Sequence, residues 1–307
     1  GADLWTPNFN VPMRDSLLWV YEGQTQFWGY VLATRAGLWN KQMGLDAIAE
    51  TAAVYALRPG RQWRNVLDTT NDPIIAHRAP APWRNWQRSE DYYSEGQLIW
   101  LEADMLIRQK TNNSKSLDDF AKAFFGINNG SYVTVTYNFD DVVKALNSVV
   151  PYDWATFLHS RLDKTGTDPL GGLKMGGYKL AFTDKPTGYI KSNEGIRKIT
   201  DLLFSLGVIL DKKGVATEVM WDGPAMKAGV TVGTEIVAVN GNAYDADDLK
   251  DVITDAKANN APIQLLLKDS DQYRTVSVNY HGGLRYPHLE RLPGTPALLD
   301  DLLAPRT

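Results

Sequence analysis

Cysteine is absent from the 307 residues, which excludes disulfide bonds and thiolate metal ligands. A basic excess is also missing, since 32 Lys and Arg stand against 36 Asp and Glu. Nucleic-acid-binding proteins carry a basic patch or stripe, so we expect no nucleic-acid partner. No apolar run approaches the roughly 18 residues of a membrane span, so no membrane span is expected. This composition is compatible with either the cytoplasm or a bacterial periplasm.

What the chain does contain differs between its two halves. Nine of the ten tryptophans lie before residue 155. Apolar periodicity and good helix formers in this first half predict helices. They span residues 14–36, 44–57, 91–109, 117–125, 139–149 and 152–162. Asn138 is the expected N-cap of the fifth helix, and Pro151 is expected in the first turn of the sixth.

The second half has a sequence pattern typical of β-structure. Five glycines and a proline in residues 164–177 indicate a domain boundary. Beyond it, turn signals separate β-rich runs, which favours a small, partly open β-barrel. The runs are 205–210, 214–221, 234–239, 263–268 and 272–280, with one helix at 245–258. We therefore predict a helical part (1–165), a linker and strand (166–190), a small β-domain (191–281) and a C-terminal tail (282–307).

The stretch "DGPAMKAGVTVGTEIVAVNG", residues 222–241, resembles the signature of bacterial PDZ domains. Its glycines suit tight turns, and its alanines let a short helical turn approach the sheet. The resemblance implies that an added peptide strand binds between a loop-and-strand segment and a helix. The implied peptide-binding residues are Ser205, Leu206, Gly207, Val208, Ile209, Leu249 and Ile253. The alternative is a domain with the PDZ fold that packs against its own chain and binds no free peptide.

A single acid, Glu22, stands within "LLWVYEGQTQFWGY", where desolvating a carboxylate is costly without a partner. Pairing with Arg14 or Arg35 is one explanation. However, "WVYEGQTQFWGYVLATRAGL", residues 19–38, resembles the second zinc helix of the glycyl aminopeptidase family, metallopeptidases of the gluzincin type. The matching residues are Glu22, Gly23, Thr25, Phe27 and Arg35-Ala36-Gly37-Leu38. The resemblance implies that Glu22 is a zinc ligand.

A second segment, "YYSEGQLIWLEADMLIR" (residues 92–108), is similar to the tyrosine-x-x-glycine helix of the same family. Tyr93 has the position of the family's tyrosine, which stands over the metal. A phenol there would stabilise the oxyanion during attack on the peptide carbonyl; the alternative is that Tyr93 only packs. The tail "YHGGLRYPHLERLPGTP", residues 280–296, also resembles the end of the family's sequences.

The H-E-x-x-H motif of zincins is missing. The four histidines are His77, His159, His281 and His288, and none is followed by another at the motif's spacing. A catalytic zinc takes three protein ligands, and only one can be named here. In the family, the missing motif lies upstream of the segment where this chain begins.

The resemblance therefore implies the helical C-terminal part of a thermolysin-like catalytic domain, followed by a PDZ-like β-barrel. The hypothesis is the C-terminal portion of a zinc aminopeptidase that releases N-terminal glycine or small residues from peptides. The fragment itself is expected to be inactive and to hold zinc weakly. The alternative is a non-catalytic helical scaffold with a peptide-binding PDZ module.

Overall fold

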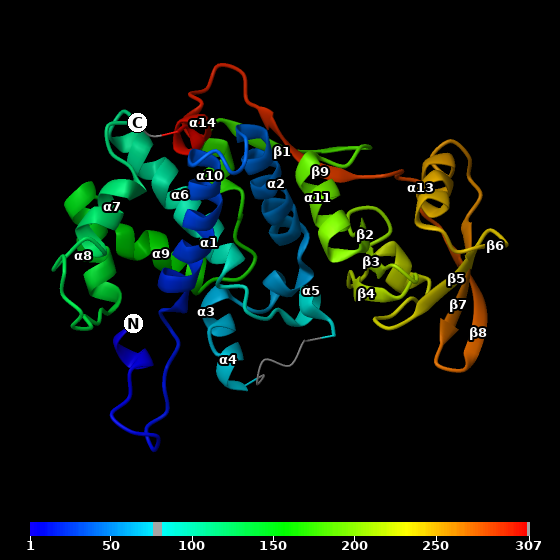
Figure 1. The fold of residues 1–307 in the computed structure, drawn as a ribbon, viewed down its shortest axis with the longest axis horizontal. Coiled ribbons are helices and arrows are strands. Elements are labelled where there is room, and N and C mark those ends of the chain that lie inside the picture. The colour runs from blue at the N-terminus through cyan, green and yellow to red at the C-terminus, as the bar shows by residue number, and fades with distance from the viewer. Residues whose placement is uncertain (76–81, 306–307) are drawn as a thin grey trace.

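The structure, a computed structural model, describes residues 1–75 and 82–305 (Figure 1). The first half is helical. It contains α1 (Leu18–Arg35), α2 (Lys41–Leu57), α3 (Val66–Thr69), α4 (Asp72–Ile75), α5 (Arg84–Gln87), α6 (Ser94–Lys110), α7 (Leu117–Phe124), α8 (Phe139–Val149), α9 (Trp154–Leu162) and α10 (Gly171–Met175). Short 3-10 turns lie at η1 (Ala2–Leu4) and η2 (Pro59–Gln62). The six helices predicted here are all present.

Local capping explains where two of these helices begin. Asn138 accepts a hydrogen bond from the backbone N–H of Asp141 at 3.0 Å and forms a capping box, as its position predicts. Pro151 does not start the next helix, so that prediction is wrong. Instead Asp153 accepts from the N–H of Thr156 at 3.1 Å, and α9 begins at Trp154. The side chain of Asp153 accepts a hydrogen bond from an N–H group at the start of the helix. The side chain of Pro151 has no acceptor and cannot cap the helix in this way.

The strands form three open sheets. The first pairs β1 (Tyr178–Thr183) with β9 (Tyr286–Arg291), and the second has the order β2 (Ile199–Leu202), β3 (Val208–Asp211), β4 (Ala216–Val219). The third has the order β6 (Asn242–Ala243), β5 (Glu235–Val239), β7 (Ile263–Asp269), β8 (Gln272–Val278). Helices α11 (Gly188–Arg197), α12 (Pro224–Lys227) and α13 (Ala246–Asp255) accompany them. Among the described residues the strands form no closed barrel, and the predicted small, partly open, PDZ-like barrel stays a prediction.

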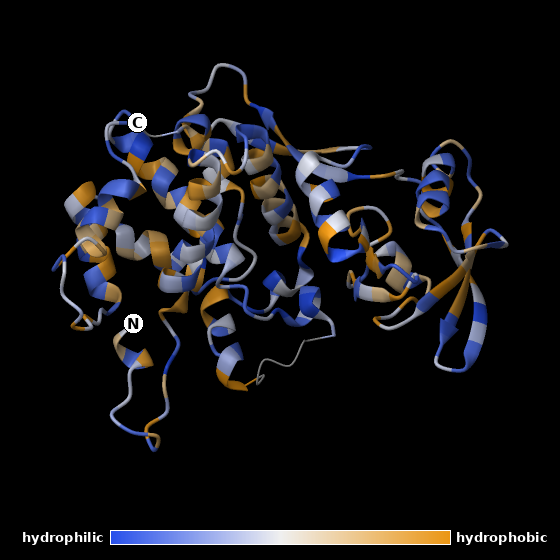
Figure 2. Cartoon of the chain, viewed as in Figure 1, coloured by the Kyte–Doolittle hydropathy of each residue, from blue (hydrophilic) through white to orange (hydrophobic). Residues whose placement is uncertain are grey.

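Apolar side chains decide which faces turn inward. Figure 2 shows hydrophobic residues concentrated on the paired strands β5 and β7, whereas β8 is largely hydrophilic. Every second residue from Ile263 to Leu267 is buried, as expected for a strand with one face on a core. In the helical half, α1, α2 and α6 enclose a core that contains Trp19, Trp100 and Trp154. No helix in the described part of the chain has the length and apolarity needed to cross a bilayer.

The C-terminal tail returns to the helical half. Strand β9 pairs with β1, and the four leucines of α14 (Leu298–Leu303) are buried in the helical core. Arg35 Nε donates to the carbonyl oxygen of Leu302 at 2.8 Å, which ties α14 to the end of α1. The tail therefore closes the core of the first half, a role that its sequence alone did not reveal.

A second connection joins the two halves near α5. The side-chain amide of Asn85 donates to the carbonyl oxygen of Val219 at 2.6 Å, and its Oδ1 accepts from the N–H of Trp221 at 2.7 Å. The rings of Trp86 and Trp221 stack with centroids 5.0 Å apart. The end of β4 is thus fixed against the loop that leads to α6.

Candidate active site

The two sequence motifs meet where α1 crosses α6. A Cβ atom on Gly23 would lie 3.1 Å from the backbone of Gly96, and one on Gly96 would lie 3.0 Å from the Cα of Gly23. Only glycine at both positions lets the backbones approach this closely. Trp19 and Trp100 stack on each other at 5.6 Å beside the crossing. The glycine of each motif is therefore the contact that brings the motifs together.

The crossing places Glu22 near the tyrosine pair at the start of α6. Glu22 is half-buried, and it makes no ion pair within the part of the chain that the structure describes. Arg35, one of its two expected partners, instead pairs with Asp118 at 2.8 Å. The Glu22 carboxylate is thus available to a cation.

Tyr92 and Tyr93 lie ring against ring, with centroids 4.9 Å apart. Burial raises the pKa of Tyr92 far above its usual range, and the charges of Glu90, Glu22 and Asp15 add to this effect. Tyr92 therefore stays protonated at any physiological pH. The electrostatic effect of Glu22 on Tyr92 also shows that the two predicted site segments are neighbours in space.

Asp15, just before α1, has the same surroundings. It is buried, its Oδ1 atom has no hydrogen-bond partner among the described residues, and burial raises the pKa of its carboxyl group. Uncompensated buried carboxylates are costly. Two acids without a cationic partner, Asp15 and Glu22, thus lie close to Tyr92.

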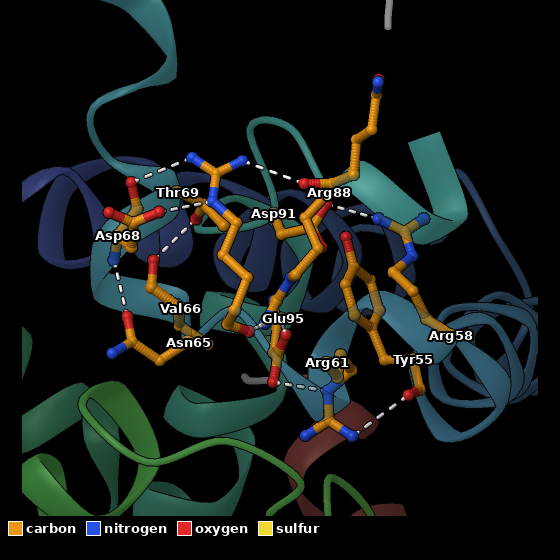
Figure 3. Close-up of polar contacts among 12 residues, drawn as sticks. Tyr55, Arg58, Arg61, Asn65, Val66, Asp68, Thr69, Arg88, Asp91 and Glu95 are labelled. Carbon is orange, nitrogen blue, oxygen red and sulfur yellow. Dashed lines mark hydrogen bonds and ion pairs between the residues drawn. The ribbon is translucent and has the colours of Figure 1, made fainter. Parts of the chain in front are cut away.

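A chain of buried ion pairs surrounds the start of α6 (Figure 3). Asp91 binds Arg58 and also accepts from Arg88 Nε at 2.7 Å. Glu95 binds Arg88 and also accepts from Arg61 Nε at 2.8 Å. Burial opposes ionisation of Asp91, but Arg58 and Arg88 together lower its pKa below the usual range. We did not predict these residues from the sequence. The arginine-rich stretch 58–64, together with the acids on both sides of the tyrosines, could have suggested the ion pairs.

A cavity of about 410 Å³ opens beside Tyr93. One wall comes from α2 and from residues 84–94, and the opposite wall from α11, β2, β3 and β4. Glu50 of α2 and Asp201 of β2 both line it. Burial raises the pKa of Glu50 to about 7 and that of Asp201 to about 6. Tyr93 thus faces a cavity large enough for a short peptide segment and lined by residues of both halves.

The described residues do not supply a complete metal site. No three carboxylate or imidazole side chains converge in residues 1–75 and 82–305. His159, His281 and His288 lie on α9, after β8 and in β9, and His77 lies outside the described residues. Glu22 makes no ion pair among the described residues, and its role as a zinc ligand stays a prediction.

The residues predicted to bind a PDZ ligand are enclosed by their own chain. Strand β3, the expected docking strand, is paired with β2 on one side and with β4 on the other. Leu249 and Ile253, the expected groove wall, have exposed fractions of 0%. Ile209 packs with Ala53 of α2. Within the described residues β3 has no free edge, so its role in peptide binding stays a prediction that requires β2 to move away.

The other residues of this predicted peptide-binding loop also make contacts within their own chain. Leu206 and Val208 are in the core of the strand-rich half, and Gly207 has the positive φ of 79° that the loop needs. The Ser205 hydroxyl accepts from the N–H of Arg285 at 3.0 Å.

Comparison with known proteins agrees with the motif that contains Glu22. The sequence model of the M61 glycyl aminopeptidase family matches residues 1–99, a range that includes both Glu22 and Tyr93. The resemblance to the glycyl aminopeptidase family is thereby confirmed. No curated protein sequence matches the chain.

The fold of the chain is similar to that of a solved structure over nearly its whole length. A crystal structure of an aminopeptidase N family protein from Idiomarina loihiensis superposes with a TM-score of 0.71 over 97% of the chain, at 16% identity. At this identity the likeness concerns the fold alone. The chain spans 50% of the length of that structure. Both comparisons include the segment from α1 to the start of α6.

Proposed function

We propose that this chain is the C-terminal portion of a zinc-dependent aminopeptidase that releases N-terminal glycine or another small residue from peptides. The observation that carries the proposal is the contact of Gly23 with Gly96, which joins the expected metal ligand to the expected oxyanion tyrosine. Peptide substrate would enter the cavity beside Tyr93. The remaining ligands and the general base would come from sequence preceding Gly1, so the chain alone would be inactive.

The residues of this chain would have distinct parts in the reaction. Bound zinc would supply Lewis-acid polarisation of the scissile carbonyl and an activated water molecule. Glu22 would hold the metal through its unpaired carboxylate. Tyr93 would donate a hydrogen bond to the carbonyl oxygen as negative charge develops there, which lowers the barrier because the donor is already in place. Tyr92, kept protonated by its burial, would add no competing negative charge.

The test is a comparison of two carboxylates in the complete protein encoded by the gene. Glu22→Gln should reduce zinc affinity at least about 100-fold, since it removes a first ligand and its charge. Glu90→Gln is the matched control, because Glu90 also acts on Tyr92 but is no expected ligand. It should retain zinc. Zinc competition titration measures both; wild-type affinity in Glu22→Gln would refute the proposal.

A further inference from the structure

Five alternating charges lie buried in one row beside the proposed site: Arg58, Asp91, Arg88, Glu95 and Arg61. Each of these side chains is between 1% and 6% exposed. Figure 3 shows the row between the end of α2 and the start of α6. We call it the ionic row.

The two acids of the ionic row bracket Tyr93. Asp91 precedes Tyr93 by two residues and Glu95 follows it by two. The backbone N–H of Glu95 donates to the carbonyl oxygen of Asp91 at 2.8 Å, so both acids belong to the same first turn. The ion pairs of these two carboxylates therefore anchor the backbone turn that carries the Tyr93 phenol.

The three arginines hold this turn from two other segments. Arg58 and Arg61 follow α2, and Arg61 also donates to the carbonyl oxygen of Thr167 at 2.7 Å. Arg88 has a φ of 60°, and it donates to the carbonyl oxygen of Arg64 at 2.6 Å. A positive φ at a non-glycine residue is strained and persists only where surrounding contacts fix it. The start of α6 is thus held in one position from two sides.

Such a row is not an efficient way to stabilise a fold. Taking charges out of water is costly, and apolar side chains of similar volume often give equal or greater stability. A planar guanidinium group that makes two hydrogen bonds provides a fixed geometry. Arg58 and Asp91 also line the same cavity as Tyr93. The row therefore lies where an exact phenol position matters.

We propose that the ionic row positions the Tyr93 phenol for reaction, with Arg58, Asp91, Arg88, Glu95 and Arg61 as positioning residues that act through Tyr93. This inference rests on the proposed function, since it assumes that Tyr93 acts on the substrate. It assigns to these buried residues a part in turnover in addition to any part in stability.

A double-mutant cycle in the complete protein tests this. Arg58→Lys keeps the charge but removes the guanidinium group that donates from Nη1 to Asp91, and it should lower kcat about 10- to 100-fold through displacement of the phenol, with KM changed less than about twofold. In the Tyr93→Phe background the same substitution should lower kcat less than about twofold, because there is no phenol left to misplace. A role in stability alone would give the same loss in both backgrounds.

Arg35→Lys is the matched control. Like Arg58, Arg35 binds a carboxylate in a mostly buried pair, here that of Asp118, to which it makes two hydrogen bonds. It should lower the melting temperature and leave kcat unchanged. Where Arg58→Lys fails to fold, Arg61→Lys at the other end of the row replaces it in the cycle.

The outcomes separate the inference from the proposed function. Wild-type turnover in Tyr93→Phe would remove Tyr93 from the mechanism and overturn both. A slow Tyr93→Phe enzyme combined with equal losses from Arg58→Lys in the two backgrounds would overturn the positioning role alone. Coupled losses, together with an unaffected Arg35→Lys, would establish it.

Discussion

The two halves of the molecule bury different kinds of side chain. In the described residues, every fully buried charged side chain lies before residue 110, among them Asp15, Arg58, Arg88, Asp91 and Glu95. After residue 190 the buried polar residues are only Thr200, Ser205 and Thr234 within the same described part. The difference indicates where geometry is specified by charge and where simple apolar packing is sufficient. The charged interior surrounds the candidate active site.

The strand-rich half uses its buried residues differently. Its sequence resembles a ligand-binding module, yet the residues expected to receive a ligand are used for its own packing. Leu206, Leu249 and Ile253 belong to one apolar cluster, and β3 is the middle strand of its sheet. The cavity beside Tyr93 is partly walled by this half, through Ile209 and Asp201. In this structure the strand-rich half therefore contributes a wall of the site, and peptide binding by its predicted loop and helix stays a prediction.

The largest effect should come from an uncompensated charge in the ionic row. Asp91→Ala leaves Arg58 and Arg88 without their shared carboxylate, and removing one partner of a buried ion pair costs about 3–5 kcal/mol. Urea denaturation of the chain measures the loss. Asp68→Ala is the control, because Asp68 is 54% exposed in its pair with Arg64 and should cost less than about 1 kcal/mol. Similar losses for both variants would contradict the view that burial makes this row special.

An apolar truncation should mark the strand-rich half. Ile253→Ala removes a fully buried side chain from the cluster around β3, at a cost of about 2–4 kcal/mol. Hydrogen exchange should show that protection falls in β2 to β8 and stays unchanged in α1 and α6. Val252→Ala, at a partly buried neighbour, should cost distinctly less. Uniform loss of protection in both halves would mean that they unfold as one unit.

The glycine crossing should respond to a single methyl group. Gly96→Ala puts a Cβ about 3.0 Å from Gly23, which forces α1 and α6 apart at a cost of about 1–3 kcal/mol. Gly29→Ala on α1 is the control, since nothing lies within 4 Å of its added Cβ. It should stabilise the chain by up to about 1 kcal/mol, because alanine favours the helix. Melting temperatures compare the two; a Gly96→Ala variant as stable as Gly29→Ala would show that the close approach is not needed.

These comparisons also show what the sequence could predict. The segments around Glu22 and Tyr93 could be singled out because each carries a short motif whose glycine makes the contact between helices, and the roles of these two residues stay predictions. The N-cap Asn138 was predictable because capping is local. The ionic row was not, since Arg58 and Asp91 are far apart in sequence and only the fold joins them. The same holds for the pairing of β1 with β9, because it joins segments that are far apart in sequence.

An effect similar in size to that of the glycine crossing concerns the border of the two halves, where Glu50 of α2 and Asp201 of β2 line one cavity. Burial, reinforced by Asp201, raises the pKa of Glu50 from 4.5 to about 7. Between these values the folded chain keeps a proton that the unfolded chain has lost. Stability should therefore fall as pH rises from about 4.5 to 7, by about 1–3 kcal/mol for this group, and remain lower above pH 7.

Glu50→Gln removes the titrating group, so it should flatten the pH dependence and make the chain more stable than wild type at pH 8. Urea denaturation at several pH values measures this. Glu290→Gln is the control, because a hydrogen bond from Lys179 lowers the pKa of Glu290, which therefore does not titrate in this range. An unchanged pH profile in Glu50→Gln would mean that solvent reaches Glu50 freely. The border between the halves would then be hydrated and would not be a desolvated wall of the site.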